Sequence, residues 1–150
     1  MTLQPKAMDH IALKVTDLAK SVHFYHDVLG LELTRPFTPG QGRAAAVRAG
    51  EQKIDIFYRE DFVSASKMDP VGVDHMCLVY EVGDASVDDV FDYLRKQDVE
   101  VMWGPVIGRF GGSWTSIYVY DPDGIHVELR FPTPVADRQP EREPALAGAH

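Results

Sequence analysis

The chain has 150 residues, 45% of them hydrophobic and 25% charged, which is the composition of one globular domain with a sizeable core. Its formal net charge of -8 at pH 7 leaves no basic surplus for binding nucleic acid or an anionic membrane, so a small-molecule ligand is expected. The apolar runs are too short to cross a membrane and no secretory signal is recognisable, so a cytoplasmic protein is expected. The single cysteine, Cys77, excludes an intramolecular disulfide.

The sequence contains an internal repeat. An Asp-His pair opens two similar segments, DHIALKV at residues 9–15 and DHMCLVY at residues 74–80, and the alternation of apolar residues predicts that each is a strand. Each half then continues with one helix and three more strands. The pattern therefore predicts an α+β protein of two tandem βαβββ modules, at about residues 7–58 and 73–131.

In the first module, Asp17 is expected to cap a helix of roughly residues 18–29, which Gly30 ends. Residues 59–72 are interpreted as the link to the second module. The remaining strands of the first module are predicted at residues 31–37, 43–49 and 52–58.

In the second module, Ser86 and Asp89 resemble a capping box at the start of a helix. Residues 132–150 hold four of the ten prolines together with Ala and alternating charges, which predicts a flexible tail outside a single domain of residues 1–131. The remaining strands of the second module are predicted at residues 99–106, 115–120 and 125–131.

Side chains suited to metal binding recur on equivalent faces of the predicted strands. Because side chains alternate along a strand, His10, His75 and Glu128 all point away from the apolar face of their strands. Overlaying KIDI (53–56) on HVEL (126–129) places Asp55 at the position of Glu128. Imidazole and carboxylate groups suit one divalent ion of Fe, Mn, Ni or Zn, and two His with one carboxylate leave positions open for a substrate. Each residue alone also fits a hydrogen-bonded His or a surface acid, and the recurrence favours the metal site.

Three segments resemble the vicinal oxygen chelate superfamily of glyoxalases, epimerases, antibiotic-resistance proteins and extradiol dioxygenases. They are DHIALKVTDLAKSVHFYHDVLGLEL, DHMCLV and SIYVYDPDGIHVEL, and the resemblance spans roughly residues 7–131. It implies a glyoxalase-like fold, in which a curved mixed sheet surrounds a central metal cleft, and a homodimer. It also implies His10, His75 and Glu128 as metal ligands. Asp55 is one methylene shorter than the Glu common in glyoxalases and epimerases, so binding through water is expected there.

The resemblance leaves the reaction open. The segment YVYDPDG before Glu128 slightly favours an extradiol ring-cleaving dioxygenase, in which the equivalent of Tyr118 lies beside the catechol. The His usual ahead of that Tyr is missing, and Arg109 is the nearest polar candidate to stabilise an anionic substrate oxygen. The alternative is a glyoxalase- or epimerase-like lyase or isomerase, with Asp55 moving the proton. A third interpretation is a metal-free protein that sequesters a drug.

Other side chains carry weaker expectations. The aromatic residues Phe57, Trp103, Trp114 and Tyr118 are expected to belong to the core rather than to line a pocket. Cys77 shares the face of His75, but a small buried hydrophobe is its expected role.

Overall fold

The computed structural model describes residues 9–35, 38, 42–61, 73–81, 85–107 and 113–133. The chain forms two compact units, Met1–Met68 with Pro122–Gly124 and Asp69–Asp121 with Ile125–His150, and each is described by itself. The predicted link lies outside the described residues from 62 to 72, and the predicted tail lies outside them from 134 onward. No helix in the described ranges has the length and apolar character needed to cross a membrane.

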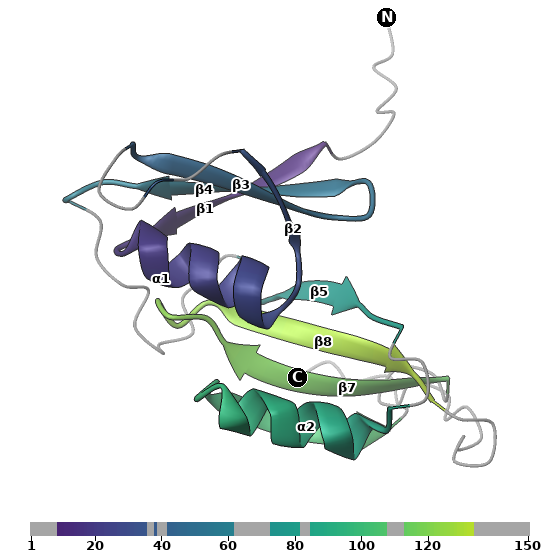
Figure 1. Cartoon of the computed structure of the whole chain (residues 1–150). Coiled ribbons are helices and arrows are strands. Elements are labelled where there is room, and N and C mark those ends of the chain that lie inside the picture. The colour runs from purple at the N-terminus through teal and green to yellow at the C-terminus, as the bar shows by residue number, and fades with distance from the viewer. Residues whose placement is uncertain are drawn as a thin grey trace, which may run out of the picture. The chain divides into compact units, whose positions relative to one another are not determined.

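The first unit contains one four-stranded sheet and one helical segment (Figure 1). Its strand order is β1-β4-β3-β2, with β1 parallel to β4 and the other neighbours antiparallel. The strands are β1 (His10–Val15), β2 (Glu32–Arg35), β3 (Ala44–Ala49) and β4 (Gln52–Tyr58), and the helical segment is α1 (Leu18–Val22) followed directly by η1 (His23–Val28).

The second unit repeats this plan. Its strand order is β5-β8-β7-β6, with β5 parallel to β8 and the other neighbours antiparallel. The prediction of two tandem βαβββ modules is therefore confirmed. The elements are β5 (Met76–Val79), α2 (Val87–Lys96), β6 (Val101–Ile107), β7 (Trp114–Tyr120) and β8 (His126–Pro132).

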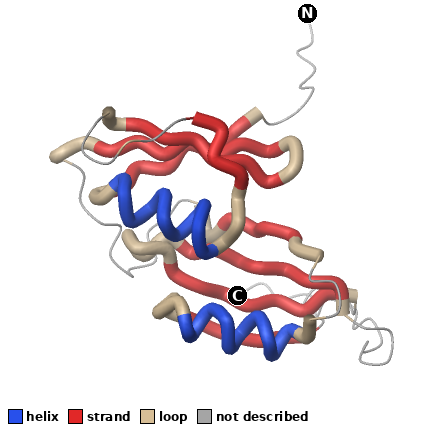
Figure 2. Tube along the Cα trace, in the orientation of Figure 1, coloured by secondary structure: helices blue, strands red, loops and turns tan. Residues whose placement is uncertain are grey.

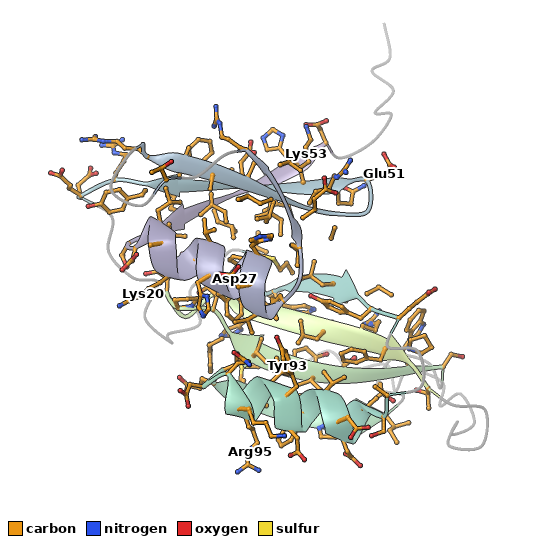
Figure 3. The ribbon with its side chains drawn as sticks, in the orientation of Figure 1. Lys20, Asp27, Glu51, Lys53, Tyr93 and Arg95 are labelled. Carbon is orange, nitrogen blue, oxygen red and sulfur yellow. The ribbon has the colours of Figure 1, made fainter. Side chains whose placement is uncertain are left out.

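Each helix covers one face of its own sheet (Figure 2), and the strand alternation decides which face. In β1, Leu13 and Val15 are buried while His10, Ala12 and Lys14 are exposed, as the pattern predicts. On the helices, Lys20 and Arg95, labelled in Figure 3, are exposed. The core residues of the strands are Leu13, Val15, Ala45, Val47, Ile54 and Ile56 in the first unit, and Met76, Leu78, Ile117, Val119, Val127, Leu129 and Phe131 in the second.

The first helix begins where predicted but changes type along its length. Asp17 accepts a hydrogen bond from the backbone N–H of Lys20, and Gly30 follows the helix with φ of +75°, a conformation that glycine adopts readily. From His23 onward the helix is π-helical, whereas an α-helix was predicted for the whole segment. Phe24, Tyr25 and Val28 are the buried residues of this segment, and an apolar stripe does not distinguish a π turn from an α turn.

The second helix carries the predicted capping box. The Ser86 hydroxyl accepts from the backbone N–H of Asp89 at 3.1 Å, and the Asp89 carboxylate accepts from the backbone N–H of Ser86 at 2.9 Å. Hydrogen bonds from the side chain and the backbone of Ser86 hold the pKa of Asp89 below its ordinary value. The cap therefore couples the start of α2 to an ionised carboxylate.

Replacing Ser86 by Ala is expected to lower the free energy of unfolding by about 1 kcal/mol, because one helix N–H loses its acceptor. The pKa of Asp89 should rise at the same time. A carboxyl with a lowered folded-state pKa stabilises above its unfolded pKa and loses that contribution as the pH falls through the folded value, so the difference between the two proteins should shrink in acid. Urea unfolding at several pH values measures this, with Asp92→Ala on the same helix as the control. A difference that stays constant with pH would contradict the coupling.

Candidate functional site

The register of the two sheets places the candidate ligands at equivalent positions. In the first unit, Ala12 pairs with Asp55 across the parallel β1–β4 contact, and His10 lies two residues before Ala12. In the second unit, Cys77 pairs with Glu128 across the parallel β5–β8 contact, and His75 lies two residues before Cys77. Asp55 and Glu128 therefore occupy the same place in their modules, as the overlay of the sequence predicts.

Glu128 is a buried acid in the middle of its sheet, with only 1% of its surface exposed. Three donors share one of its oxygens. Oε1 accepts from the Ser116 hydroxyl at 2.7 Å, from Arg130 Nη2 at 2.9 Å and from Arg130 Nε at 3.1 Å. The carboxylate is therefore held in one orientation by groups that engage a single oxygen.

The other oxygen of Glu128 faces His75. Glu128 Oε2 lies 2.9 Å from His75 Nε2, and His75 Nδ1 lies 2.5 Å from Asp74 Oδ2. When Asp74 accepts the Nδ1–H proton, the Nε2 lone pair is left for a cation, which is the usual relay of carboxylate, histidine and metal in proteins. The pair His75 and Glu128 thus presents one nitrogen and one carboxylate oxygen to the same point.

The first unit has a corresponding pair. His10 Nδ1 lies 2.9 Å from Asp9 Oδ2, and His10 Nε2 lies 3.8 Å from Asp55 Oδ2. Here too the residue before the histidine orients the ring, and the other ring nitrogen faces the acid. Strand alternation alone predicts no role for Asp9 and Asp74, and the repeated Asp-His pair is the sequence signal that points to one.

The ionisation of the second pair follows from its contacts. Burial by itself raises the pKa of Glu128, but the hydrogen bonds from Ser116 and Arg130 and the charges of Arg130 and His75 outweigh it and lower that pKa. Cys77, expected to be a buried hydrophobe, is instead exposed on the same face as Glu128. Partial burial, together with the Glu128 charge, raises the pKa of its thiol to about 11, so Cys77 is a neutral thiol near pH 7.

Tyr118 forms the wall beside this pair. It is the neighbour of Glu128 on β7, its ring meets the His75 ring edge-on with centroids 5.7 Å apart, and it stacks on Trp103 at 5.5 Å. Its surface is 5% exposed. The sequence-predicted Tyr118 therefore lies against the His75 and Glu128 pair, whereas Arg109 lies outside the described residues.

The expectation that the aromatic residues belong to the core is correct for Tyr118 alone. Phe57, Trp103 and Trp114 are 39%, 42% and 38% exposed. Trp103 pairs with Tyr118, the neighbour of Glu128, and Phe57 lies two residues after Asp55, so both lie on the face of their sheet that carries the candidate ligands rather than on the face that the helix covers. Strand periodicity assigns a face but does not show whether anything covers it.

The structure thus describes the candidate ligands as two pairs, His75 with Glu128 and His10 with Asp55. Within the described ranges, no cluster of three or more His, Cys, Asp or Glu side chains is placed to hold a metal ion. Each pair contributes one nitrogen and one carboxylate oxygen, the donor types that divalent transition metals prefer.

Comparison with known proteins matches residues 7–129 to the family model described as the Glyoxalase/Bleomycin resistance protein/Dioxygenase superfamily. A virulence protein of Salmonella typhimurium is 30% identical over 125 residues, 81% of each chain. The glutathione transferase FosA of Serratia marcescens is 27% identical over 143 residues, covering 95% of this chain and 93% of that protein. The lactoylglutathione lyase of Haemophilus influenzae is 32% identical over 133 residues, covering 80% and 88%.

Solved structures share the fold. A glyoxalase/dioxygenase from Nostoc punctiforme superposes with a TM-score of 0.70 at 22% identity, over 89% of this chain and 98% of that one. The crystal structure of the virulence protein of Salmonella typhimurium gives a TM-score of 0.62 at 25% identity, over 87% and 100%.

Replacing Ser116 by Ala is expected to raise the pKa of Glu128, because one of the donors that stabilise the ionised form is removed. The stability that this lowered pKa contributes is present above the ordinary value of 4.5 and is lost as the pH falls through the folded value, so the variant should lose stability at higher pH than the wild type does. NMR titration of the Glu128 carboxyl measures the shift. Thr115→Val is the control, because the Thr115 hydroxyl bonds Thr133. An unchanged pKa in Ser116→Ala would show that the serine does not hold the carboxylate.

Proposed function

The chain belongs to the Glyoxalase/Bleomycin resistance protein/Dioxygenase superfamily, and on that premise we propose that it is a divalent-metal-dependent enzyme acting on a small oxygenated molecule. In this proposal His75 and Glu128 are metal ligands and His10 is the third. Asp55 is a weaker or water-mediated ligand, because its carboxylate is one methylene shorter than that of Glu128.

The observation that carries the proposal is the arrangement around Glu128. Its Oε1 is occupied by Ser116 and Arg130, which leaves Oε2 facing His75 Nε2 at 2.9 Å. His75 Nδ1 is occupied by Asp74, so both remaining donor atoms point to one place. Each of the two side chains is held by hydrogen bonds at its other polar atom, Oε1 of Glu128 or Nδ1 of His75. The remaining nitrogen and carboxylate oxygen suit a divalent cation.

The proposed reaction assigns a separate role to each of Glu128, Tyr118 and Asp55. A bound divalent cation would act as a Lewis acid that polarises a substrate oxygen. The hydrogen bonds to Oε1 keep Glu128 ionised and in one orientation during the proposed reaction. Tyr118 contributes a buried aromatic wall with a hydroxyl able to donate or accept a hydrogen bond. Asp55, whose side chain is 29% exposed, is the candidate to take up and return a proton.

For the class of reaction, lyase or transferase chemistry is the first candidate. The sequence alone slightly favours ring cleavage, but the relatives with a stated activity are a glutathione transferase and a lactoylglutathione lyase, at 27% and 32% identity. Extradiol dioxygenase chemistry is the second candidate, because Tyr118, whose equivalent in those enzymes lies beside the catechol, packs edge-on against the proposed ligand His75. The preferred metal separates them: activity with Fe(II) and oxygen supports ring cleavage, and activity with Mn, Ni or Zn without oxygen supports the lyase or transferase.

Glu128→Gln is expected to weaken metal binding by more than the roughly 10- to 100-fold typical of losing a group that only orients a ligand. The amide keeps the shape of the side chain and can still accept from Ser116, so the fold should persist. Asp55→Asn should weaken binding less. Titration calorimetry of the chelator-treated full chain with Mn²⁺ measures both, with Asp92→Asn on α2 as the control.

Three outcomes of the Mn²⁺ titration would change the proposed set of metal ligands. Unchanged Mn²⁺ affinity in both Glu128→Gln and His75→Ala would refute the metal site and leave the metal-free, ligand-sequestering protein. Equal losses in Glu128→Gln and Asp55→Asn would make Asp55 a full ligand and move the assignment to a four-ligand, glyoxalase-type site. Retention of affinity in His10→Ala would remove His10 from the set.

The proposal also includes a homodimer. The strands β1 and β5 each end their described sheet, and an edge strand exposes backbone groups that favour pairing unless they are covered. A second copy can cover such an edge through a twofold contact.

Light scattering at micromolar concentration should therefore give twice the chain mass of 16.8 kDa. A monomer mass that persists on concentration would refute the dimer, and loss of the dimer on deleting residues 134–150 would show that the tail forms it.

A further inference from the structure

Arg130 is the basic side chain beside the candidate metal ligand Glu128 in the second unit. It lies two residues after Glu128 on β8, so both side chains project from the same face of the sheet. Its neighbour on β7 is Ser116, and its neighbour on β5 is Val79 (Figure 1). Ser116 and Arg130 therefore belong to the row of side chains that follows Glu128 along the sheet.

The other candidate ligand, His75, reaches Glu128 from the row before it. Cys77 pairs with Glu128, and His75 lies two residues before Cys77. Arg130 and His75 therefore approach the carboxylate from opposite directions along the sheet, and each reaches a different oxygen. Oε1 accepts hydrogen bonds from Arg130 and Ser116. Oε2 lies 2.9 Å from His75 Nε2.

The hydrogen bonds to Oε1 occupy that oxygen fully. Arg130 donates through Nε at 3.1 Å and through Nη2 at 2.9 Å, and the Ser116 hydroxyl donates at 2.7 Å. A carboxylate oxygen has about two lone-pair directions, so these donors leave none for an ion. The side chain of Glu128 is 2% exposed, so little water reaches the carboxylate to replace them. A cation at this site therefore finds Oε2 and not Oε1.

The first unit has the same sheet without these donors. Its acid is Asp55, and two residues later comes Phe57, as Arg130 follows its own acid. Phe57 pairs with Ala44, and neither side chain donates a hydrogen bond. Asp55 Oδ2 lies 3.8 Å from His10 Nε2, farther than the 2.9 Å of the second pair. The shorter side chain of Asp55 contributes to this difference, so the test is made on Arg130 itself.

We propose that Arg130 is a positioning residue that makes Glu128 a one-oxygen ligand and thereby selects against large cations such as Ca²⁺. Ca²⁺ takes roughly six to eight oxygen ligands and often both oxygens of one carboxylate. Mn²⁺, Ni²⁺ and Zn²⁺ also accept imidazole nitrogen together with carboxylate oxygen. An ion that engaged Oε1 would have to displace the charge-assisted hydrogen bonds of Arg130. The inference rests on the proposed function, because it concerns the same metal ligands.

A purely electrostatic role for Arg130 is the alternative. A cation beside an almost wholly buried carboxylate offsets the cost of burying the charge, whichever oxygen it contacts. Mn²⁺ and Ca²⁺ carry the same charge, so on this alternative the loss of Arg130 changes both affinities by the same factor. The ratio of the two affinities therefore separates a positioning role from an electrostatic one.

The ratio is measured by competition on the full chain after treatment with chelator. Binding of Mn²⁺ is followed by the loss of the electron paramagnetic resonance signal of free Mn²⁺, and Ca²⁺ is then added until half of the bound Mn²⁺ is released. Arg130→Met keeps an unbranched apolar stem and removes the donors. In this variant the affinity for Ca²⁺ relative to Mn²⁺ is expected to rise about tenfold, because Oε1 becomes available as a second ligand atom.

Arg48→Met is the matched control. Arg48 donates to Glu32 at 2.6 Å between β2 and β3, which is an Arg–Glu pair that includes no candidate ligand. Its loss should change the ratio by less than about twofold. Arg130→Lys keeps the charge and replaces the guanidinium fork by one ammonium group, so the ratio should rise by about threefold, less than in Arg130→Met.

A ratio in Arg130→Met that stays within about twofold of the wild-type value would overturn the inference and leave Arg130 an electrostatic role. An equal rise in Arg48→Met would overturn it too. If the ¹H–¹⁵N NMR spectrum shows that Arg130→Met does not fold, Arg130→Lys decides in its place, and an unchanged ratio there overturns the inference. In each of these cases a wild type that binds Mn²⁺ leaves the proposed function intact. A wild type that binds no Mn²⁺ refutes the metal-dependent function and this inference together.

Discussion

The parallel pairing of the first strand of each module with its last strand is the constraint on which the candidate site depends. It brings the Asp-His opening of a module beside an acid that lies about fifty residues later in the chain. A slip of one residue would turn every side chain of a strand to the other face. The buried residues of the opposite face, Leu13 and Val15 in β1 and Met76 and Leu78 in β5, oppose such a slip because it would expose them. The register of the core therefore also determines the register of the site.

In the second module, both proposed metal ligands are held in place by hydrogen bonds. His75 is held by the residue before it in the chain, and Glu128 by its neighbours on the same sheet, Ser116 and Arg130. Groups held in this way lose little conformational freedom when they bind a ligand. Arg130 also offsets the charge of a carboxylate that is almost wholly buried, a burial that would otherwise be costly.

The sequence predicts much of this fold because two periodicities are clear in it. The twofold repeat predicts the modules, and the alternation in β1 and β8 places His10 and Glu128 on the correct face. Periodicity does not report what covers a face, so Cys77 and Phe57 were expected to be buried and are exposed. Periodicity also does not predict the hydrogen-bond donors to Glu128, because Ser116 belongs to another strand and Arg130 has no distinguishing motif. The π turn of the first helix has no signal in an α-helical pattern.

The equivalence of the two modules has a consequence for how they have diverged. Phe57 pairs with Lys14 in the first, and Arg130 pairs with Val79 in the second, so Phe57 and Arg130 stand at matching positions two residues after their acids. If the halves descend from one duplicated ancestor, the copies have specialised at that position. In the second module, the guanidinium of Arg130 immobilises Glu128. In the first module, the ring of Phe57 stands at this position and offers Asp55 no such hydrogen bond. An exchange of the two side chains would then trade rigidity at one acid for rigidity at the other.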